Sequence, residues 1–166
     1  MFQEYNVLVL CTGNSARSIL GEAIINELGE GRVKAYSAGS RPVGRVNPFA
    51  IKLLKKKGYE TAGLYSKSWD EFTSPGAPDI DLVITVCDNA AGEECPVFMG
   101  APNKLHLGFP DPAAFDGSEE DKMALFEHVY GRMYPVLSYL IESDPLHMCA
   151  ADLRQQLIQY KEERAY

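Results

Sequence analysis

The sequence contains a short loop whose residue types suit the capture of an anion beside a reactive thiol. Cys11 ends an apolar run, and Arg17 follows after five intervening residues, at the start of a predicted helix. A loop between a strand and a helix directs backbone N–H groups inward, and the helix dipole adds partial positive charge. The same field stabilises a thiolate, the nucleophilic form of cysteine. Cys11 is therefore the candidate nucleophile for attack on a tetrahedral oxyanion.

Other residues of the loop fit the same chemistry. Arg17 can hold two oxygens of an oxyanion at once, which a lysine cannot do. Gly13 and Asn14 belong to the residue types that tolerate positive φ, as a concave loop requires. Ser18 is placed to donate a hydrogen bond to the thiolate. The predicted oxyanion-binding residues are Thr12, Gly13, Asn14, Ser15, Ala16 and Arg17.

Two alternatives to an anion-binding loop are weaker. A Walker-type loop is excluded because the glycine and lysine that end it are missing. A buried cysteine, a turn and a surface arginine would explain each residue singly. They do not explain the joint order of strand, cysteine, five residues, arginine and helix.

The elements that must position this loop alternate between strands and helices. Apolar, β-branched runs predict buried strands, and amphipathic spacing predicts helices. Strands are expected at 7–10, 32–38, 80–86 and 104–108, and helices at 18–28, 48–57, 118–141 and about 150–163. Pro135 should kink the third helix or split it near Tyr134. The alternation predicts an α/β fold, a single four-stranded parallel sheet with helices on both faces.

In such a sheet, ligands bind at the carboxyl ends of the strands. Cys11, Cys87 and the segment around Asp111 each follow a predicted strand. These three positions are therefore expected to converge at one edge of the sheet.

Composition narrows the classes of function. The 166 residues are 46% hydrophobic and 23% charged, as in an ordinary globular domain. The net charge of −7 disfavours nucleic acid and anionic membranes as partners. The sequence shows no basic signal-peptide start and no apolar run long enough to span a bilayer. We therefore expect a cytoplasmic protein whose four cysteines stay reduced.

The loop at residues 11–18, Cys-Thr-Gly-Asn-Ser-Ala-Arg-Ser, resembles the phosphate-binding loop of low-molecular-weight protein tyrosine phosphatases and of the arsenate reductases that share their fold. The resemblance extends over roughly residues 5–142 and includes the sequence Ser-Ala-Gly at 37–39. It also includes Asp111-Pro112, which matches the acid loop of the family and implies Asp111 as the general acid. We expect a catalytic domain over 1–143 and a helical extension over 144–166.

Phosphatase and reductase chemistry differ after the attack by Cys11. A phosphatase needs an acid that protonates the leaving phenolate, and then a water molecule that hydrolyses the phosphocysteine. A reductase needs a second thiol to expel arsenite, and benefits from a third that moves the disulfide to the surface. The segment 87–96 carries two thiols and is similar to the redox segment of thioredoxin-coupled arsenate reductases. By that resemblance Cys87 forms the first disulfide, and Cys95 resolves it.

Two features favour the reductase. Ala16 stands where phosphatases of this family usually carry a second cysteine, and Ala113 and Ala114 stand where they tend to carry aromatic residues. We therefore expect reduction of arsenate, with phosphate as a competitor and without a bound cofactor. The reductant would be an external thiol system such as thioredoxin or glutathione with glutaredoxin.

Several alternatives stay open. One is a tyrosine phosphatase for phosphotyrosine or small aryl phosphates, and another is a non-catalytic module that only binds an oxyanion. Cys87 and Cys95 would then be a buried strand cysteine and a loop thiol without chemistry. A zinc site at these two cysteines is disfavoured, because seven residues separate them. Cys149 has no assigned role.

Some reductases of this family hold a potassium ion near the loop, and Asn14, Glu22 and Ser37 match its positions. Lys67 stands where an acidic residue would be expected. Because a lysine ammonium there would supply the charge of the cation, we predict no bound metal. The alternative is that Lys67 is an ordinary surface lysine.

Overall fold

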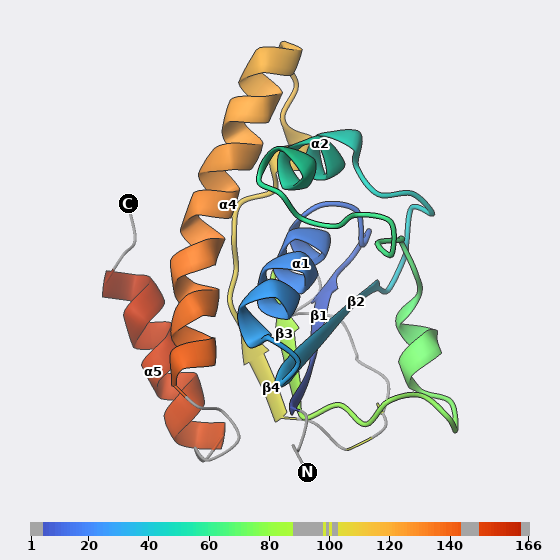
Figure 1. The fold of residues 1–166 in the computed structure, drawn as a ribbon, viewed down its shortest axis with the longest axis vertical. Helices are drawn as coiled ribbons and strands as arrows, with labels where there is room; N and C mark the ends of the chain where they lie inside the picture. The colour runs from blue at the N-terminus through green and yellow to red at the C-terminus, as the bar shows by residue number, and fades with distance from the viewer. Residues whose placement is uncertain (1–4, 88–97, 99, 101–102, 144–149, 164–166) are drawn as a thin grey trace.

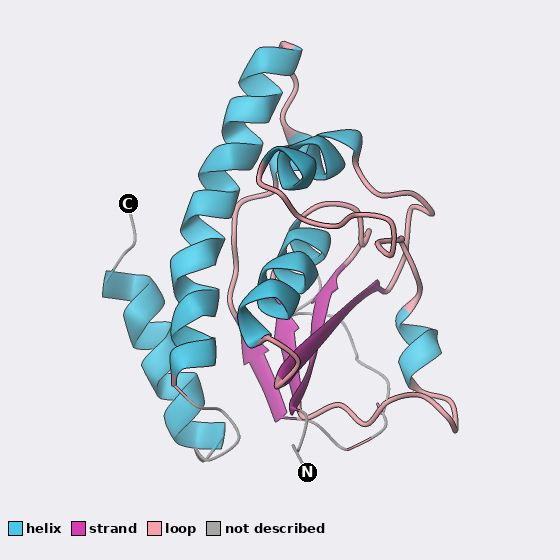
Figure 2. Ribbon diagram, viewed as in Figure 1, coloured by secondary structure: helices cyan, strands magenta, loops and turns pink. Residues whose placement is uncertain are grey.

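The computed structural model describes residues 5–87, 98, 100, 103–143 and 150–163. Its centre is one sheet of four strands in the order β2-β1-β3-β4, and every pairing is parallel (Figures 1 and 2). The strands are β1 (Tyr5–Cys11), β2 (Val33–Gly39), β3 (Leu82–Thr85) and β4 (Asn103–His106). The predicted four-stranded parallel sheet is confirmed.

Among the described α-helices, the first two lie between successive strands in the chain, and the last two follow the final strand. They are α1 (Arg17–Gly29), α2 (Pro48–Lys56), α4 (Glu119–Glu142) and α5 (Ala150–Glu163), with short 3₁₀ helices η1 (Trp69–Phe72) and η2 (Pro112–Ala114). The start of α2 follows from its sequence, because the Asn47 side chain accepts the Phe49 N–H at 2.9 Å and Pro48 takes the first position. The sequence did not predict η1 or η2.

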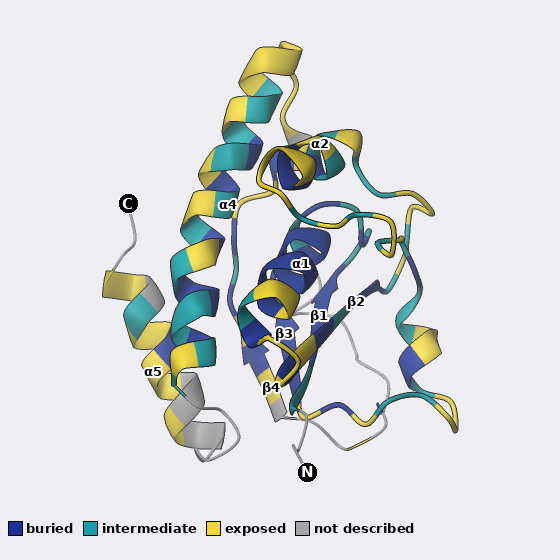
Figure 3. Ribbon diagram, in the orientation of Figure 1, coloured by how far each residue is buried: buried dark blue, intermediate teal, exposed yellow. Residues whose placement is uncertain are grey.

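The alternating side chains of β1 divide between two apolar layers. Val7 and Val9 join the core that α1, α2 and α4 cover. Leu8 and Leu10 join a smaller core that contains Phe72 of η1. Both faces of the central strand are therefore buried, as Figure 3 shows by the dark colour of β1. This explains why the strand reads as a continuous apolar run rather than an alternating one.

α4 is one uninterrupted helix through Pro135, so the expectation of a split near Tyr134 was wrong. A proline inside a helix removes one backbone hydrogen bond and crowds the preceding turn. Buried residues on both sides of Pro135 pack into the same core, among them Phe126, Val129, Val136 and Leu140. We infer that this shared packing outweighs the local cost of the proline.

The C-terminal helix α5 lies along α4 (Figure 1). Leu157 is fully buried in the main core, and the rings of Tyr139 and Tyr160 stack with centroids 4.3 Å apart. α5 therefore adds to the same packed body as the sheet. Within the described part of the chain, no helix is long and apolar enough to cross a membrane.

Candidate active site

The loop between β1 and α1 curves around the thiol of Cys11. The Asn14 backbone N–H donates to Cys11 Sγ at 3.2 Å, and Ser18 Oγ lies 3.0 Å from the same sulfur. Asn14 has a φ of 48°, as predicted for a concave loop, whereas Gly13 has no positive φ. Cys11 is 5% exposed and sits at the carboxyl end of the central strand. One backbone donor and one hydroxyl group therefore lie within hydrogen-bond distance of the same sulfur.

The first helical turn after the loop leaves its N–H groups without a side-chain cap. Ala16 occupies the N-cap position and has no side chain that can accept a hydrogen bond. The positive end of the α1 dipole therefore faces the loop. This is the arrangement that the sequence predicted for an anion site.

Arg17, the first residue of α1, joins the loop to the segment after β4. Its Nη1 donates to the carbonyl of Phe109 at 2.9 Å, and its Nη2 lies 3.5 Å from Asp111 Oδ2. The other carboxylate oxygen of Asp111 accepts the Ala113 N–H at 2.9 Å, which caps η2. The predicted acid and the predicted oxyanion clamp are thereby brought together, although 94 positions separate them in the sequence, from 17 to 111.

Cys87 lies at the same edge of the sheet. The Val86 N–H donates to the Leu10 carbonyl at 2.9 Å, so the end of β3 runs beside the end of β1. Cys87 Sγ lies 3.6 Å from Thr12 Oγ1, and the Cys87 residue is 4% exposed. Cys11 and Cys87 are both present as thiols rather than as a disulfide. The predicted convergence of Cys11, Cys87 and Asp111 is therefore present, whereas Cys95 and Cys149 lie outside the described residues.

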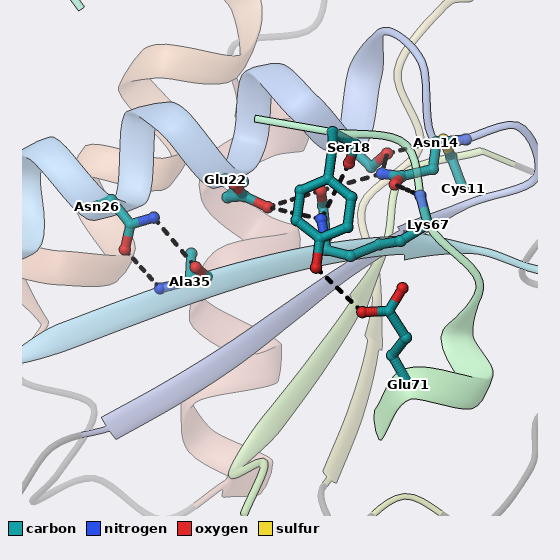
Figure 4. A network of polar contacts seen from close by, with 10 residues as sticks. Cys11, Asn14, Ser18, Glu22, Asn26, Ala35, Lys67 and Glu71 are labelled. Atoms are coloured by element: carbon teal, nitrogen blue, oxygen red, sulfur yellow. Dashed lines mark hydrogen bonds and ion pairs between the residues drawn. The ribbon is translucent and has the colours of Figure 1, made fainter. Parts of the chain in front are cut away.

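A buried polar network stands behind the loop (Figure 4). Lys67 is only 7% exposed, so the alternative of an ordinary surface lysine was wrong. Its ammonium lies 3.6 Å from Glu22 Oε1, and Ser37 Oγ donates to the same oxygen at 2.7 Å. Burial raises the pKa of the Glu22 carboxyl, while Lys67 and then the Ser37 hydrogen bond act against this rise. Among the described residues, no cluster of three or more His, Cys, Asp or Glu is arranged to hold a metal ion.

Supports for the loop from the β2 side were missed in the sequence. A Cβ on Gly39 would lie 2.4 Å from the Thr12 carbonyl oxygen, so only glycine permits this close approach. The segment after β2 also pairs with the loop, since the N–H groups of Arg41 and Val43 each donate at 3.0 Å to the carbonyls of Thr12 and Gly13. The glycine that ends the Ser-Ala-Gly sequence at 37–39 could have indicated the close approach to Thr12. The residues after it gave no indication of their hydrogen bonds to the loop.

The chain is similar to known proteins over most of its length. Residues 6–147 match the family described as low molecular weight phosphotyrosine protein phosphatase. The chain is 37% identical over 123 residues to an arsenate reductase of Bacillus subtilis, a match that covers 74% of this chain and 85% of that protein. It is 36% identical over 117 residues to arsenate reductase 1 of Staphylococcus epidermidis, covering 70% of this chain and 85% of that one.

Solved structures share the fold. An arsenate reductase from Archaeoglobus fulgidus superposes with a TM-score of 0.63 at 26% identity, covering 82% of this chain and 98% of that chain. A low molecular weight protein tyrosine phosphatase from T. tengcongensis superposes with a TM-score of 0.64 at 22% identity, covering 84% of this chain and 99% of that chain. The second likeness concerns the fold alone.

Proposed function

The chain belongs to the low-molecular-weight phosphotyrosine protein phosphatase family, and from this premise we propose that it reduces arsenate to arsenite through an intramolecular disulfide relay. The observation that carries the proposal is the position of Cys87. Its thiol is buried against Thr12, the neighbour of the candidate nucleophile Cys11. A phosphatase mechanism has no use for a second thiol at this place. The arsenate reductases among the curated relatives support the same choice.

In the first step, arsenate binds in the loop with its oxygens toward the backbone N–H groups and the Arg17 guanidinium. The Cys11 thiolate attacks arsenic, and one hydroxyl group of the monohydrogen arsenate leaves as water after taking a proton from Asp111. A covalent bond then joins Cys11 Sγ to As(V). Ser18 and the Asn14 N–H, which contact the sulfur, hold it as a thiolate before the attack.

In the second step, the Cys87 thiolate attacks Cys11 Sγ. The sulfur–arsenic bond breaks, its electron pair stays on arsenic, and arsenite leaves as As(III). The two cysteines become a disulfide, so two thiol electrons have reduced one arsenate. Cys95 then attacks Cys87, which frees Cys11 and moves the disulfide to the 87–95 pair.

The relay needs an external dithiol to restore Cys87 and Cys95. We propose a protein thiol reductant of the thioredoxin or glutaredoxin type, working in the cytoplasm, where such systems keep thiols reduced. No bound cofactor takes part, because the electrons come from cysteines. Phosphate, which has the same tetrahedral shape as arsenate, would compete for the loop. This chemistry would serve arsenic resistance. We assign the catalytic unit to 1–143 and a helical extension to 144–166.

A second activity is favoured by the contact between Arg17 and Asp111. An acid beside the oxyanion clamp is what hydrolysis of a phosphotyrosine or small aryl phosphate requires, because the leaving phenolate needs a proton. Cys11 would form phosphocysteine, which water would hydrolyse. We propose this hydrolysis as a side activity of the same site.

One paired experiment tests the proposal. Arsenate-dependent oxidation of a coupled thiol reductant and hydrolysis of p-nitrophenyl phosphate are measured in wild type, Cys11→Ser, Cys87→Ser and Cys149→Ser. Cys11→Ser should lose both activities, Cys87→Ser should lose only arsenate turnover, and Cys149→Ser should keep both. Unchanged arsenate reduction in Cys87→Ser would refute the relay. Strong ester hydrolysis without arsenate turnover would indicate a phosphatase. The absence of both activities would indicate a module that only binds an oxyanion.

A further inference from the structure

The ammonium group of Lys67 lies in the interior of the protein, beside the loop of residues 11–18. Its side chain is 6% exposed, and its Nζ lies 3.6 Å from Glu22 Oε1 and donates to the Tyr65 carbonyl at 3.0 Å. The Tyr65 ring covers the ammonium, with Nζ 4.1 Å from the ring centroid. Lysine and glutamate are rarely buried unless they are paired. A buried pair of this kind adds little stability compared with apolar packing, so its presence calls for another explanation.

The carboxylate of this pair is connected to the nucleophile by a continuous chain of hydrogen bonds (Figure 4). Ser37 Oγ donates to Glu22 Oε1 at 2.7 Å, and Asn14 Nδ2 donates to Ser37 Oγ at 3.0 Å. Asn14 Nδ2 also donates to Ser18 Oγ at 2.8 Å. Ser18 Oγ then contacts Cys11 Sγ at 3.0 Å. Only side chains that are themselves buried form this chain.

Lys67 determines the direction of donation along the chain. Its backbone N–H, which can only donate, points at Asn14 Oδ1 at 2.8 Å. The amide nitrogen of Asn14 must therefore face the two serines. Because Ser18 Oγ accepts from Asn14, its own proton is free to go to the Cys11 sulfur. A thiolate, which can only accept, is the form of Cys11 that suits this chain.

The same chain holds the backbone of the loop. Asn14 is fully buried, has a φ of 48°, and donates its own N–H to Cys11 Sγ. A non-glycine residue in the left-handed region needs its surroundings to hold it there. Both donors to the sulfur, the Asn14 N–H and the Ser18 hydroxyl, thus depend on where the Asn14 side chain is anchored.

We propose that Lys67 is a positioning residue: its ammonium is a built-in counter-ion for buried Glu22, and this pair anchors Ser37 and Asn14 so that both donors stay aimed at Cys11. Without the ammonium, Glu22 keeps an unpaired buried charge or takes up a proton. An unpaired carboxylate is drawn toward water and away from Ser37, and a protonated carboxyl is a weaker acceptor whose O–H competes for the same place, so in both cases Ser37 is held less firmly and Asn14 loses one anchor. The proposal rests on the proposed function only in taking Cys11 as the nucleophile.

The test compares single and paired removal of the two charges. Lys67→Met removes the ammonium but keeps the backbone N–H, whereas Lys67→Met with Glu22→Gln removes both charges. Lys56→Met is the matched control, because Lys56 pairs with Glu127 at 2.8 Å on the exposed surface. The rate at which iodoacetamide alkylates Cys11 at pH 7 is followed by mass spectrometry of the Cys11 peptide. Protection of Cys11 by inorganic phosphate reports the shape of the loop.

Lys67→Met should lower the alkylation rate of Cys11 at least tenfold and raise the phosphate concentration needed for half-protection. The double variant should recover to within about threefold of wild type, because the introduced glutamine amide still offers an oxygen to Ser37 and no charge is left unpaired. Lys56→Met should match wild type. If Lys67→Met does not fold, Lys67→Gln takes its place, since it keeps hydrogen-bond donors but lacks the charge. A wild-type alkylation rate in the folded single variant would overturn the proposal.

Chemical rescue separates the ammonium from a merely structural side chain. In Lys67→Ala, ammonium chloride should raise the alkylation rate of Cys11, whereas tetramethylammonium chloride at the same ionic strength should not, because it is too large for the vacated space. Equal rates in the two salts would contradict the proposal. Alkylation and phosphate protection need no arsenate turnover. If the protein does not reduce arsenate, this test can still be carried out. If the alkylation results contradict the role of Lys67, the proposed disulfide relay is not affected.

Discussion

The thiol of Cys87 lies 3.6 Å from the hydroxyl of Thr12, the residue directly after Cys11. The two strands that precede these residues, β1 and β3, are neighbours in the sheet, with Leu10 opposite Thr85. Cys87 is 4% exposed, so a reducing protein has almost no access to its sulfur in this conformation. A disulfide between Cys11 and Cys87 would be equally hidden. This gives a physical reason for a third thiol that carries the disulfide outward.

The first prediction concerns that disulfide. Cys95→Ser should stop the relay after arsenite leaves, so a Cys11–Cys87 disulfide should accumulate after one arsenate per protein. Peptide mapping without reduction measures it, together with arsenite release, and Cys149→Ser is the control. Steady turnover by Cys95→Ser, with no trapped disulfide, would remove Cys95 from the mechanism.

The second prediction concerns the oxyanion clamp. Arg17→Lys keeps the charge but loses the forked geometry that binds two oxygens at once. Losing one charge-assisted hydrogen bond costs about 1.5–3 kcal/mol, which corresponds to roughly a 10- to 150-fold lower affinity for the oxyanion. Phosphate protection of Cys11 from alkylation measures this affinity. Arg45→Lys, at an exposed position after β2, should match wild type, and equal phosphate affinity in Arg17→Lys would argue against a bidentate clamp.

The third prediction concerns the acid. Asp111→Asn keeps an oxygen for the Ala113 N–H and so preserves the cap of η2, but it cannot donate a proton as a carboxylic acid. Hydrolysis of phenyl phosphate, which has a poor leaving group, should fall by about 10²–10⁴-fold. Hydrolysis of p-nitrophenyl phosphate should fall much less, because its leaving group needs little help. An equal loss on both esters would indicate that Asp111 acts through Arg17 rather than as an acid.

The fourth prediction concerns the pH dependence of stability. Burial raises the pKa of Glu22 above 4.5, although Lys67 and Ser37 act against it. The native carboxyl then holds its proton to a higher pH than the unfolded chain does. Its contribution to stability is therefore fully present below pH 4.5 and is lost as the pH rises through the raised pKa. Glu22→Gln cannot ionise, so this downward slope should disappear from urea midpoints measured between pH 4 and 7.

Glu127→Gln is the control for this slope, because the ionisation of Glu127 should change the stability with pH in the opposite direction. The hydrogen bond from Lys56 lowers the pKa of the exposed Glu127 carboxyl. Its contribution is therefore present above pH 4.5 and is lost as the pH falls through the lowered pKa. The same slope in wild type and in Glu22→Gln would mean that Glu22 does not titrate differently in the native and unfolded states.

The fifth prediction separates stability from chemistry in the C-terminal helix. Leu157 is 0% exposed, whereas the adjacent Ile158 is 37% exposed. Leu157→Ala should lower the free energy of unfolding by about 2 kcal/mol or more, and Ile158→Ala by about 0.5 kcal/mol or less. Both variants should keep wild-type kcat when folded. A loss of kcat in Leu157→Ala at a temperature where the protein stays folded would give α5 a part in the reaction.

Local features of the sequence predicted much of the fold. The apolar run before Cys11, the Asn-Pro start of α2 and the helical spacing after Ser118 each appeared where short-range physics places them. The loop was also recognisable, because cysteine, a residue able to take positive φ and arginine stand close together in one segment. Asn14, with its φ of 48°, confirmed that part. Such features depend on residues within a few positions of one another, so the sequence by itself determines them.

Contacts between distant segments were decided only by the tertiary structure. Arg17 meets Asp111, Thr12 meets Cys87, and Lys67 meets Glu22 because the strand order β2-β1-β3-β4 brings separate segments to one edge. The family resemblance placed the Lys67 ammonium near Glu22, but nothing near Lys67 in the sequence reveals the buried carboxylate, so an ordinary surface lysine was an equal alternative. Pro135 was expected to kink or split the helix, since nothing near it reveals the core that holds both halves of α4. Burial and pairing are properties of the packed fold, and they overrode local preference at both positions.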